Sequence, residues 1–144
     1  MLTLCEALRA AHAGGGLRKL ERLILMDNQM GDGAAAALAA LLEEGAMPNL
    51  KELNLNNNQI ANAGVPALAS ALRGGALPAC TYIDLNGNQI ADDGVAALAS
   101  ALRGGALPSC EDIFLNGNPG SGAPVIRALA SPERAAALAR RQAE

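Results

Sequence analysis

The feature that most constrains this chain is a repeat of thirty residues. Residues 50–79 return almost unchanged as residues 80–109, and only four of the last twenty-one positions of the two copies differ. A looser copy covers residues 20–49, and a partial copy begins at Cys110. Self-similarity at such a period is typical of repeat proteins whose units stack along one axis. The near identity of the central copies is compatible with a recent duplication or with a designed or consensus sequence.

Each repeat joins a strand pattern to a helix pattern. Residues 50–55 place leucines among polar residues, which predicts a short, half-buried strand. Residues 65–72 are rich in alanine and repeat their apolar positions every three or four residues, which predicts a helix. Pro66 suits the first helical turn, and Gly74-Gly75 ends the helix. Because one strand and one helix cannot close a core, the repeats are expected to stack into a parallel sheet covered by helices.

The strand segments resemble the leucine-rich repeat signature LxxLxLxxN, which is met at residues 20–28 and 50–58. The third and fourth copies carry cysteine and isoleucine in place of the first two leucines. The pattern that follows, seen in residues 60–72, is similar to the ribonuclease-inhibitor-like class. This resemblance implies an α/β leucine-rich repeat solenoid, a short horseshoe arc with its parallel β-sheet on the concave face and its α-helices on the convex face.

The chain is expected to form a single domain, residues 1–144. Its predicted parts, in order, are an N-terminal cap or degenerate repeat (1–19), three full repeats (20–49, 50–79 and 80–109), a partial repeat strand (110–118) and a C-terminal helical cap (119–144). Outside the central copies, helices are predicted at about 1–13, 33–44, 123–130 and 132–141. Ser131 is the predicted N-cap of the last helix.

An asparagine recurs at every thirtieth position, just after each predicted strand. The column consists of Asn28, Asn58, Asn88 and Asn118. A buried amide both donates and accepts hydrogen bonds, so it is able to satisfy the backbone groups left unpaired where the chain turns. We therefore predict a structural role for this asparagine ladder.

The third, fifth and seventh positions of each strand segment are expected to point away from the helices, onto the open face of the sheet. These positions form three columns across the four strands. The first column is Arg22, Glu52, Tyr82 and Asp112. The second is Ile24, Asn54, Asp84 and Phe114. The third is Met26, Asn56, Asn86 and Asn116. We call these twelve residues the sheet face.

Tyr82 and Phe114, the one tyrosine and the one phenylalanine of the chain, both fall on the sheet face. Aromatic groups anchor protein interfaces out of proportion to their number, so the face is a candidate partner-binding surface. In the alternative interpretation, Phe114 and Ile24 tuck under the terminal caps. The carboxylates of the face outnumber its single arginine, which favours a basic partner. Their spacing suits neither a metal site nor a catalytic acid pair, so we predict no enzyme activity, no metal and no cofactor.

The net charge of −3, with scattered basic residues, argues against nucleic-acid binding. No apolar run of about eighteen residues is present, and the start lacks a basic segment before an apolar one. We therefore expect neither a membrane span nor a secretory signal. His12, the single histidine, is predicted to be solvated or to cap a helix rather than to bind a metal.

Three cysteines leave an odd number. Cys80 and Cys110 stand in the leucine column of the strands and are predicted to be small buried hydrophobes. A disulfide between them is the less favoured alternative, because it would strain a parallel ladder. Free thiols, together with the absence of a glycosylation sequon, favour a cytoplasmic, intracellular setting.

Three functions remain open at this point. The first is a non-enzymatic module that binds a protein partner through the concave sheet face, as the resemblance implies. The second is a regulator of an enzyme, since relatives of this class include ribonuclease inhibitors and GTPase activators. The third is self-association, for example as a homodimer through the edge strand at residues 20–25, unless the N-terminal helix covers that strand.

Overall fold

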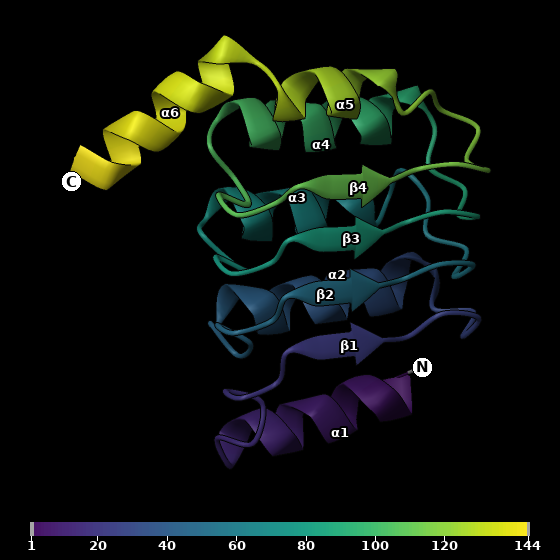
Figure 1. Ribbon diagram of the computed structural model, residues 1–144. Coiled ribbons are helices and arrows are strands. Elements are labelled where there is room, and N and C mark those ends of the chain that lie inside the picture. Colours follow the sequence, from purple (N-terminus) through teal and green to yellow (C-terminus); the bar gives the residue numbers. More distant parts are fainter. Residues whose placement is uncertain (1, 144) are drawn as a thin grey trace.

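The computed structural model describes residues 2–143. Four strands lie side by side, with the helices of the repeats behind them (Figure 1). The elements, in order, are α1 (Leu2–Ala13), β1 (Arg22–Ile24), α2 (Gly31–Glu43), β2 (Glu52–Asn54), α3 (Val65–Arg73), β3 (Tyr82–Asp84), α4 (Asp92–Arg103), β4 (Asp112–Phe114), α5 (Ala123–Leu129) and α6 (Pro132–Ala143). The predicted helix bounds are met to within about two residues at each end.

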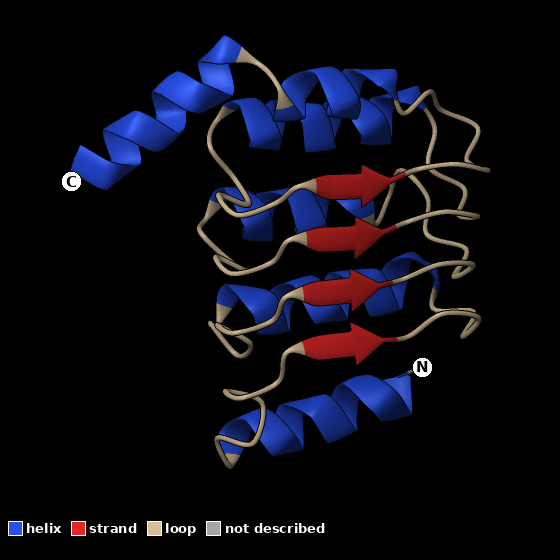
Figure 2. Cartoon of the chain, in the orientation of Figure 1, coloured by secondary structure: helices blue, strands red, loops and turns tan. Residues whose placement is uncertain are grey.

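The strands form one parallel sheet in the order β1-β2-β3-β4. Arg22 pairs with Glu52, Glu52 with Tyr82 and Tyr82 with Asp112, so the register advances by one thirty-residue period per strand. One layer of strands therefore faces one layer of helices, as Figure 2 shows in red and blue. This arrangement confirms the predicted α/β repeat solenoid.

The core lies between the sheet and the helices and is built from the same positions in each repeat. In the second repeat Leu50, Leu53 and Leu55 point inward and are at most 2% exposed. Leu68 and Leu72 of α3 meet them from the helix layer and are also buried. Aliphatic side chains, with some cysteine and methionine, fill this space without an aromatic ring, because helix and sheet approach each other over many alanines.

All three cysteines are buried free thiols. Cys80 and Cys110 occupy the inward column that holds Leu50 in the second repeat, which confirms their prediction as small buried hydrophobes. Burial raises the pKa of Cys80, and it raises that of Cys110 to about 12. Both thiols therefore stay protonated at neutral pH, a state in which they react slowly.

The asparagine ladder runs through the turns that follow the strands. Asn88 accepts hydrogen bonds from the backbone N–H groups of Asn58 and Ile60 and donates to the carbonyls of Leu55 and Leu85, each at 3.0 Å. Asn58 and Asn88 are buried, whereas Asn118 is half-buried and Asn28 is exposed. The expectation of a buried amide is therefore wrong for Asn28, because no strand precedes β1 among the described residues.

A second ladder, which we did not predict, joins the starts of the helices. Asp32 Oδ1 accepts from the N–H of Ala61 at 2.8 Å, and Asn62 Oδ1 accepts from the N–H groups of Ala91 and Gly94 at 3.0 Å. A Cβ atom at Gly94 would lie 2.6 Å from that Asn62 oxygen. Gly64 and Gly94 thus leave room for the Asx side chain of the preceding repeat.

The first repeat supports this explanation of the glycines. Ala34 occupies the position that corresponds to Gly64 and Gly94, and no earlier repeat supplies an Asx side chain there. Asp32, Asn62 and Asp92 are thirty residues apart, so their recurrence was a visible signal in the sequence. The sequence interpretation did not include this column.

The helices at the two ends of the chain pack differently. At the β1 end of the stack, α1 is joined to the body by Cys5, whose thiol donates to the carbonyl of Ala34 at 3.9 Å. His12 is half-buried rather than solvated, and its Nε2 lies 3.4 Å from a carboxylate oxygen of Glu44. The notion of residues 1–19 as a cap stays a prediction.

At the other end α5 lies beside α4, in the place that the helix of a fourth repeat would take (Figure 1). Ser131 accepts a hydrogen bond from the N–H of Arg134 at 3.1 Å, which confirms it as the N-cap of α6. Ala137 of α6 lies over Gly105, in the loop before β4, rather than over the open edge of β4. The predicted role of residues 119–144 as a cap is not decided by this arrangement.

None of the helices in residues 2–143 combines the length and the apolar character that crossing a membrane requires.

Candidate protein-binding face

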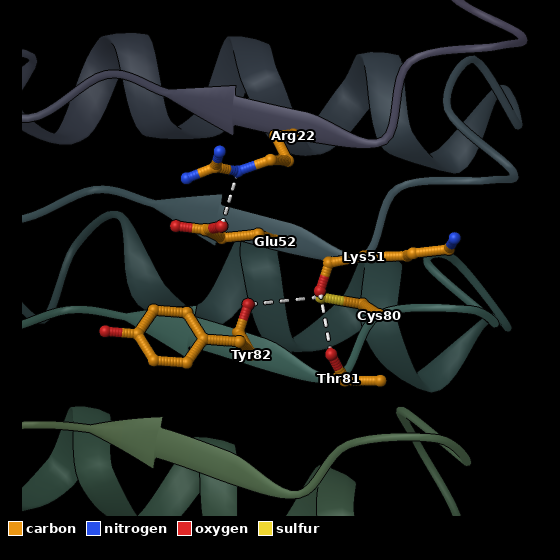
Figure 3. Close-up of polar contacts among 6 residues, drawn as sticks. All are labelled: Arg22, Lys51, Glu52, Cys80, Thr81 and Tyr82. Carbon is orange, nitrogen blue, oxygen red and sulfur yellow. Dashed lines mark hydrogen bonds and ion pairs between the residues drawn. The ribbon is translucent and has the colours of Figure 1, made fainter.

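The first column of the sheet face is polar and contains an ion pair. Arg22 Nε donates to Glu52 Oε2 at 2.7 Å, across β1 and β2. Figure 3 shows Arg22, Glu52 and Tyr82 on three neighbouring strands, with Cys80 donating through its thiol to the carbonyl of Tyr82. Asp112, at the β4 end of the column, is exposed and forms no ion pair with any residue between 2 and 143.

The second column changes from apolar to polar and back to apolar. Ile24 on β1 is 44% exposed, and Asn54 and Phe114 are half-buried. Asp84 is only 6% exposed, although its column was predicted to lie on the open face of the sheet. Its Oδ1 accepts a hydrogen bond from the N–H of Asn86 at 2.8 Å, so this carboxylate also stabilises the backbone at the end of β3. A partner reaches Asp84 only through the small area that its neighbours leave open.

The third column consists of Met26, which is 43% exposed, and three asparagines. Asn56 Nδ2 lies 3.4 Å from Asp84 Oδ2, and Asn86 Oδ1 accepts from the N–H of Asn116 at 2.7 Å. The side-chain amides of this column therefore form hydrogen bonds between neighbouring repeats as well as facing outward. Beyond this column, Asn57 Nδ2 donates to Asp27 Oδ1 at 3.0 Å. The sequence interpretation left out this exposed pair, which extends the sheet face.

Tyr82 and Phe114 lie against each other on β3 and β4. Their ring centroids are 5.2 Å apart and the ring planes are tilted by 48°. That geometry lies within the range of favourable aromatic pairs. Desolvation raises the pKa of the Tyr82 phenol, and the carboxylates of Asp84, Glu52 and Asp112 raise it further. The aromatic pair therefore sits in a negative environment.

A hollow of about 580 Å³ adjoins the sheet face at the open edge of β4. Phe114 and Asn116 line it from the strand, and Ile126 and Leu129 line it from α5. Ile126 is 64% exposed, so apolar surface continues from the aromatic pair around this end of the stack.

Potential metal ligands do not cluster among the described side chains. Within residues 2–143 no three histidine, cysteine, aspartate or glutamate side chains come together as metal ligands would. The arrangement instead combines aromatic and apolar anchors with a polar surround, which is the make-up of a protein interface.

Comparison with known protein families adds one finding. Residues 16–39, 46–69 and 81–99 each match the leucine-rich repeat family. A search of curated proteins gave no match. Each matched segment contains one strand, and the three segments end at positions thirty residues apart, within α2, α3 and α4. Leucine-rich repeats generally mediate protein–protein interaction and are typically non-catalytic. The chain is thus an α/β solenoid in which three segments match the leucine-rich repeat family.

Proposed function

We propose that this protein is a non-enzymatic module that binds another protein through its sheet face. The observation that carries the proposal is the contact between Tyr82 and Phe114, with ring centroids 5.2 Å apart on the solvent side of the sheet. Neither ring enters the core between sheet and helices, although the chain has no other aromatic side chain. Large rings kept out of a core are typical anchors of an interface.

The charges around the rings favour a basic partner. Asp112 is exposed, Glu52 is half-buried and engaged by Arg22, and Asp84 is nearly covered. Because opposite charges steer association and fix orientation, lysine or arginine groups of a partner suit the surround of Tyr82. Binding to a ribonuclease or to a small GTPase would be a special case of this proposal. It involves no cofactor and no nucleic acid.

A cellular setting belongs to the same proposal. The three thiols are free and buried, and reduced cysteines of this kind are typical of proteins inside the cell. We therefore infer a cytoplasmic location.

Substitutions on the face test the proposal. After affinity capture and mass spectrometry have identified a partner, we expect Tyr82→Ala and Phe114→Ala each to weaken its binding at least about tenfold, the usual loss at an interface anchor. Arg103→Ala, an exposed change at the end of α4, is the matched control and is expected to leave the affinity unchanged. If both ring variants stay folded and bind as the unchanged protein does, the sheet face is not the binding surface.

Self-association is a second candidate, favoured by one observation. Ile24 on β1 and Met26 just after it are 44% and 43% exposed, at the edge where no further strand among the described residues pairs with the sheet. Sedimentation equilibrium at increasing concentration measures this directly. A dimer that Ile24→Asp abolishes supports the candidate, and a monomer at every concentration removes it.

A further inference from the structure

Two loops of nearly the same sequence have different surroundings. Residues 74–78 and 104–108 both read GGALP. Their backbones agree closely, because Gly75 and Gly105 have φ of 98° and 92°, while Leu77 and Leu107 have φ of 57° and 52°. Any difference in what touches these loops therefore comes from outside the repeat.

The chain's own last helix covers the second of these loops. Arg134 of α6 is only 8% exposed and donates through Nη2 to the carbonyl of Leu107. Seven residues further along, Arg141 Nη2 donates to the carbonyl of Arg73 at 3.1 Å. Between them, Ala137 lies so close that a Cβ atom at Gly105 would be 3.3 Å from its own Cβ. One face of α6 thus contacts three groups: the carbonyl of Leu107, the backbone at Gly105, and the carbonyl of Arg73, the last residue of α3.

The corresponding place one repeat earlier is open. A Cβ atom at Gly75 would meet nothing within 4 Å, and Ala76 is half-buried where Ala106 is fully buried. A groove of about 160 Å³ lies here, and we call it the loop groove. Its lining includes Gly45, Met47, Pro48, Gly75, Ala76 and Leu77.

The loop groove presents the same hydrogen-bond acceptors as the covered site. The carbonyl of Leu77 accepts from the N–H of Cys80 at 3.2 Å, just as that of Leu107 accepts from the N–H of Cys110 at 3.0 Å. A carbonyl oxygen has two lone pairs, so Leu77 retains capacity for a second donor. The last residue of α2, Glu43, corresponds to Arg73 at the end of α3.

The charge at this position differs between the repeats in an informative way. Glu43 is exposed and stands where the later repeats carry Arg73 and Arg103. Among the described residues it forms no ion pair, whereas its neighbour Glu44 is engaged by Arg9 and His12. A cationic side chain that reached the carbonyl of Glu43 would also meet the Glu43 carboxylate.

We propose that the loop groove binds a helix of a partner protein that carries arginine, a small residue and arginine at its first, fourth and eighth positions. This spacing is that of Arg134, Ala137 and Arg141 in α6. One arginine donates to the carbonyl of Leu77, the small residue packs over Gly75, and the other arginine reaches the end of α2 at Glu43. The site lies on the loops that lead into the strands, apart from the sheet face, and it does not depend on the proposed function of that face.

The experiment uses the full chain, labelled with ¹⁵N, and an N-acetylated synthetic peptide of residues 131–144 as the probe. We expect saturable shifts of the backbone amide signals of Gly75, Ala76 and Leu77. Glu43→Arg is expected to weaken binding about fivefold, since an exposed attraction becomes a repulsion. Asp93→Arg makes the same charge change at the far end of α4 and is expected to have no effect. Tyr82→Ala is also expected to leave peptide binding unchanged.

Two further variants make the result decisive. Ala76→Arg fills the loop groove and is expected to abolish the shifts at Gly75, and a peptide with both Arg134→Gln and Arg141→Gln is expected to bind more weakly. Shifts confined to Gly105 and Ala106 would mean that the peptide only displaces α6, which overturns the proposal. So would the absence of saturable shifts. Shifts at Gly75 that grow with protein concentration alone would assign the groove to a second copy of this chain instead.

Discussion

The inner and outer repeats of this solenoid use the same residues with different results. Asn58 and Asn88 are 0% and 4% exposed, because a repeat covers each of them on both sides. Asn28 stands in the same column of the first repeat and is exposed. The sequence position is equivalent, but the contribution of the residue to stability depends on its neighbours in the stack.

The largest expected difference concerns the asparagine ladder. Asn88→Ala removes an amide that forms five hydrogen bonds and leaves buried backbone groups without partners. We expect the free energy of unfolding to fall by about 3 kcal/mol. Asn28→Ala removes two hydrogen bonds at an exposed site, so a loss of about 1 kcal/mol or less is expected. Urea unfolding followed by circular dichroism measures both, and equal losses would contradict the comparison.

Gly94, which faces the second ladder, and Gly33, which does not, provide a smaller contrast. A Cβ atom at Gly94 would lie 2.6 Å from Asn62 Oδ1 and 2.7 Å from Ile90 Cγ2, inside the stack. Gly94→Ala is therefore expected to destabilise the protein by about 2 kcal/mol. At Gly33, in the first repeat, a Cβ atom would meet nothing within 4 Å. Gly33→Ala is expected to stabilise the protein by about 0.5 kcal/mol, since alanine favours the helix.

Thermal melts of these two variants are sufficient to check the contrast. A Gly94→Ala protein that melts at the temperature of the unchanged protein would contradict this expectation. It would show that the neighbouring repeats shift to accommodate the added methyl group without a loss of stability.

The smallest expected effect concerns Tyr82. Its pKa is raised by desolvation, and further by Asp84 on its own strand and by Asp112 on the end strand β4. It is the one tyrosine of the chain, so ultraviolet absorbance reports its titration alone. Removing a negative charge beside a phenol makes its ionisation easier, so both Asp84→Asn and Asp112→Asn are expected to lower the pKa. The reduction should be larger for Asp84, which is buried on the same strand, than for Asp112 on the end strand. The reverse order would mean that the end strand governs the environment of the ring.

The sequence alone established the architecture, because each thirty-residue repeat contains the local patterns that specify its own strand and helix. Leucines at alternate positions define the strands, and alanine-rich segments between glycines define the helices, so the parallel order of the sheet follows from the thirty-residue period. The orientation of the columns followed from the same alternation, which brought Tyr82 and Phe114 to one face. Ser131 was recognised as an N-cap from its local sequence.

The tertiary structure alone decided how far each of these residues is covered. Asp84 is closed in by neighbours from adjoining strands, and Asn28 is exposed because no strand pairs with β1 on its outer side among the described residues. The seating of α6 on the loop of Gly105, and not on the identical loop of Gly75, depends on the turn at residues 130–131, which sets the direction of α6. A repeat sequence specifies which contacts each unit is able to make, whereas burial and docking depend on which units lie next to it in space.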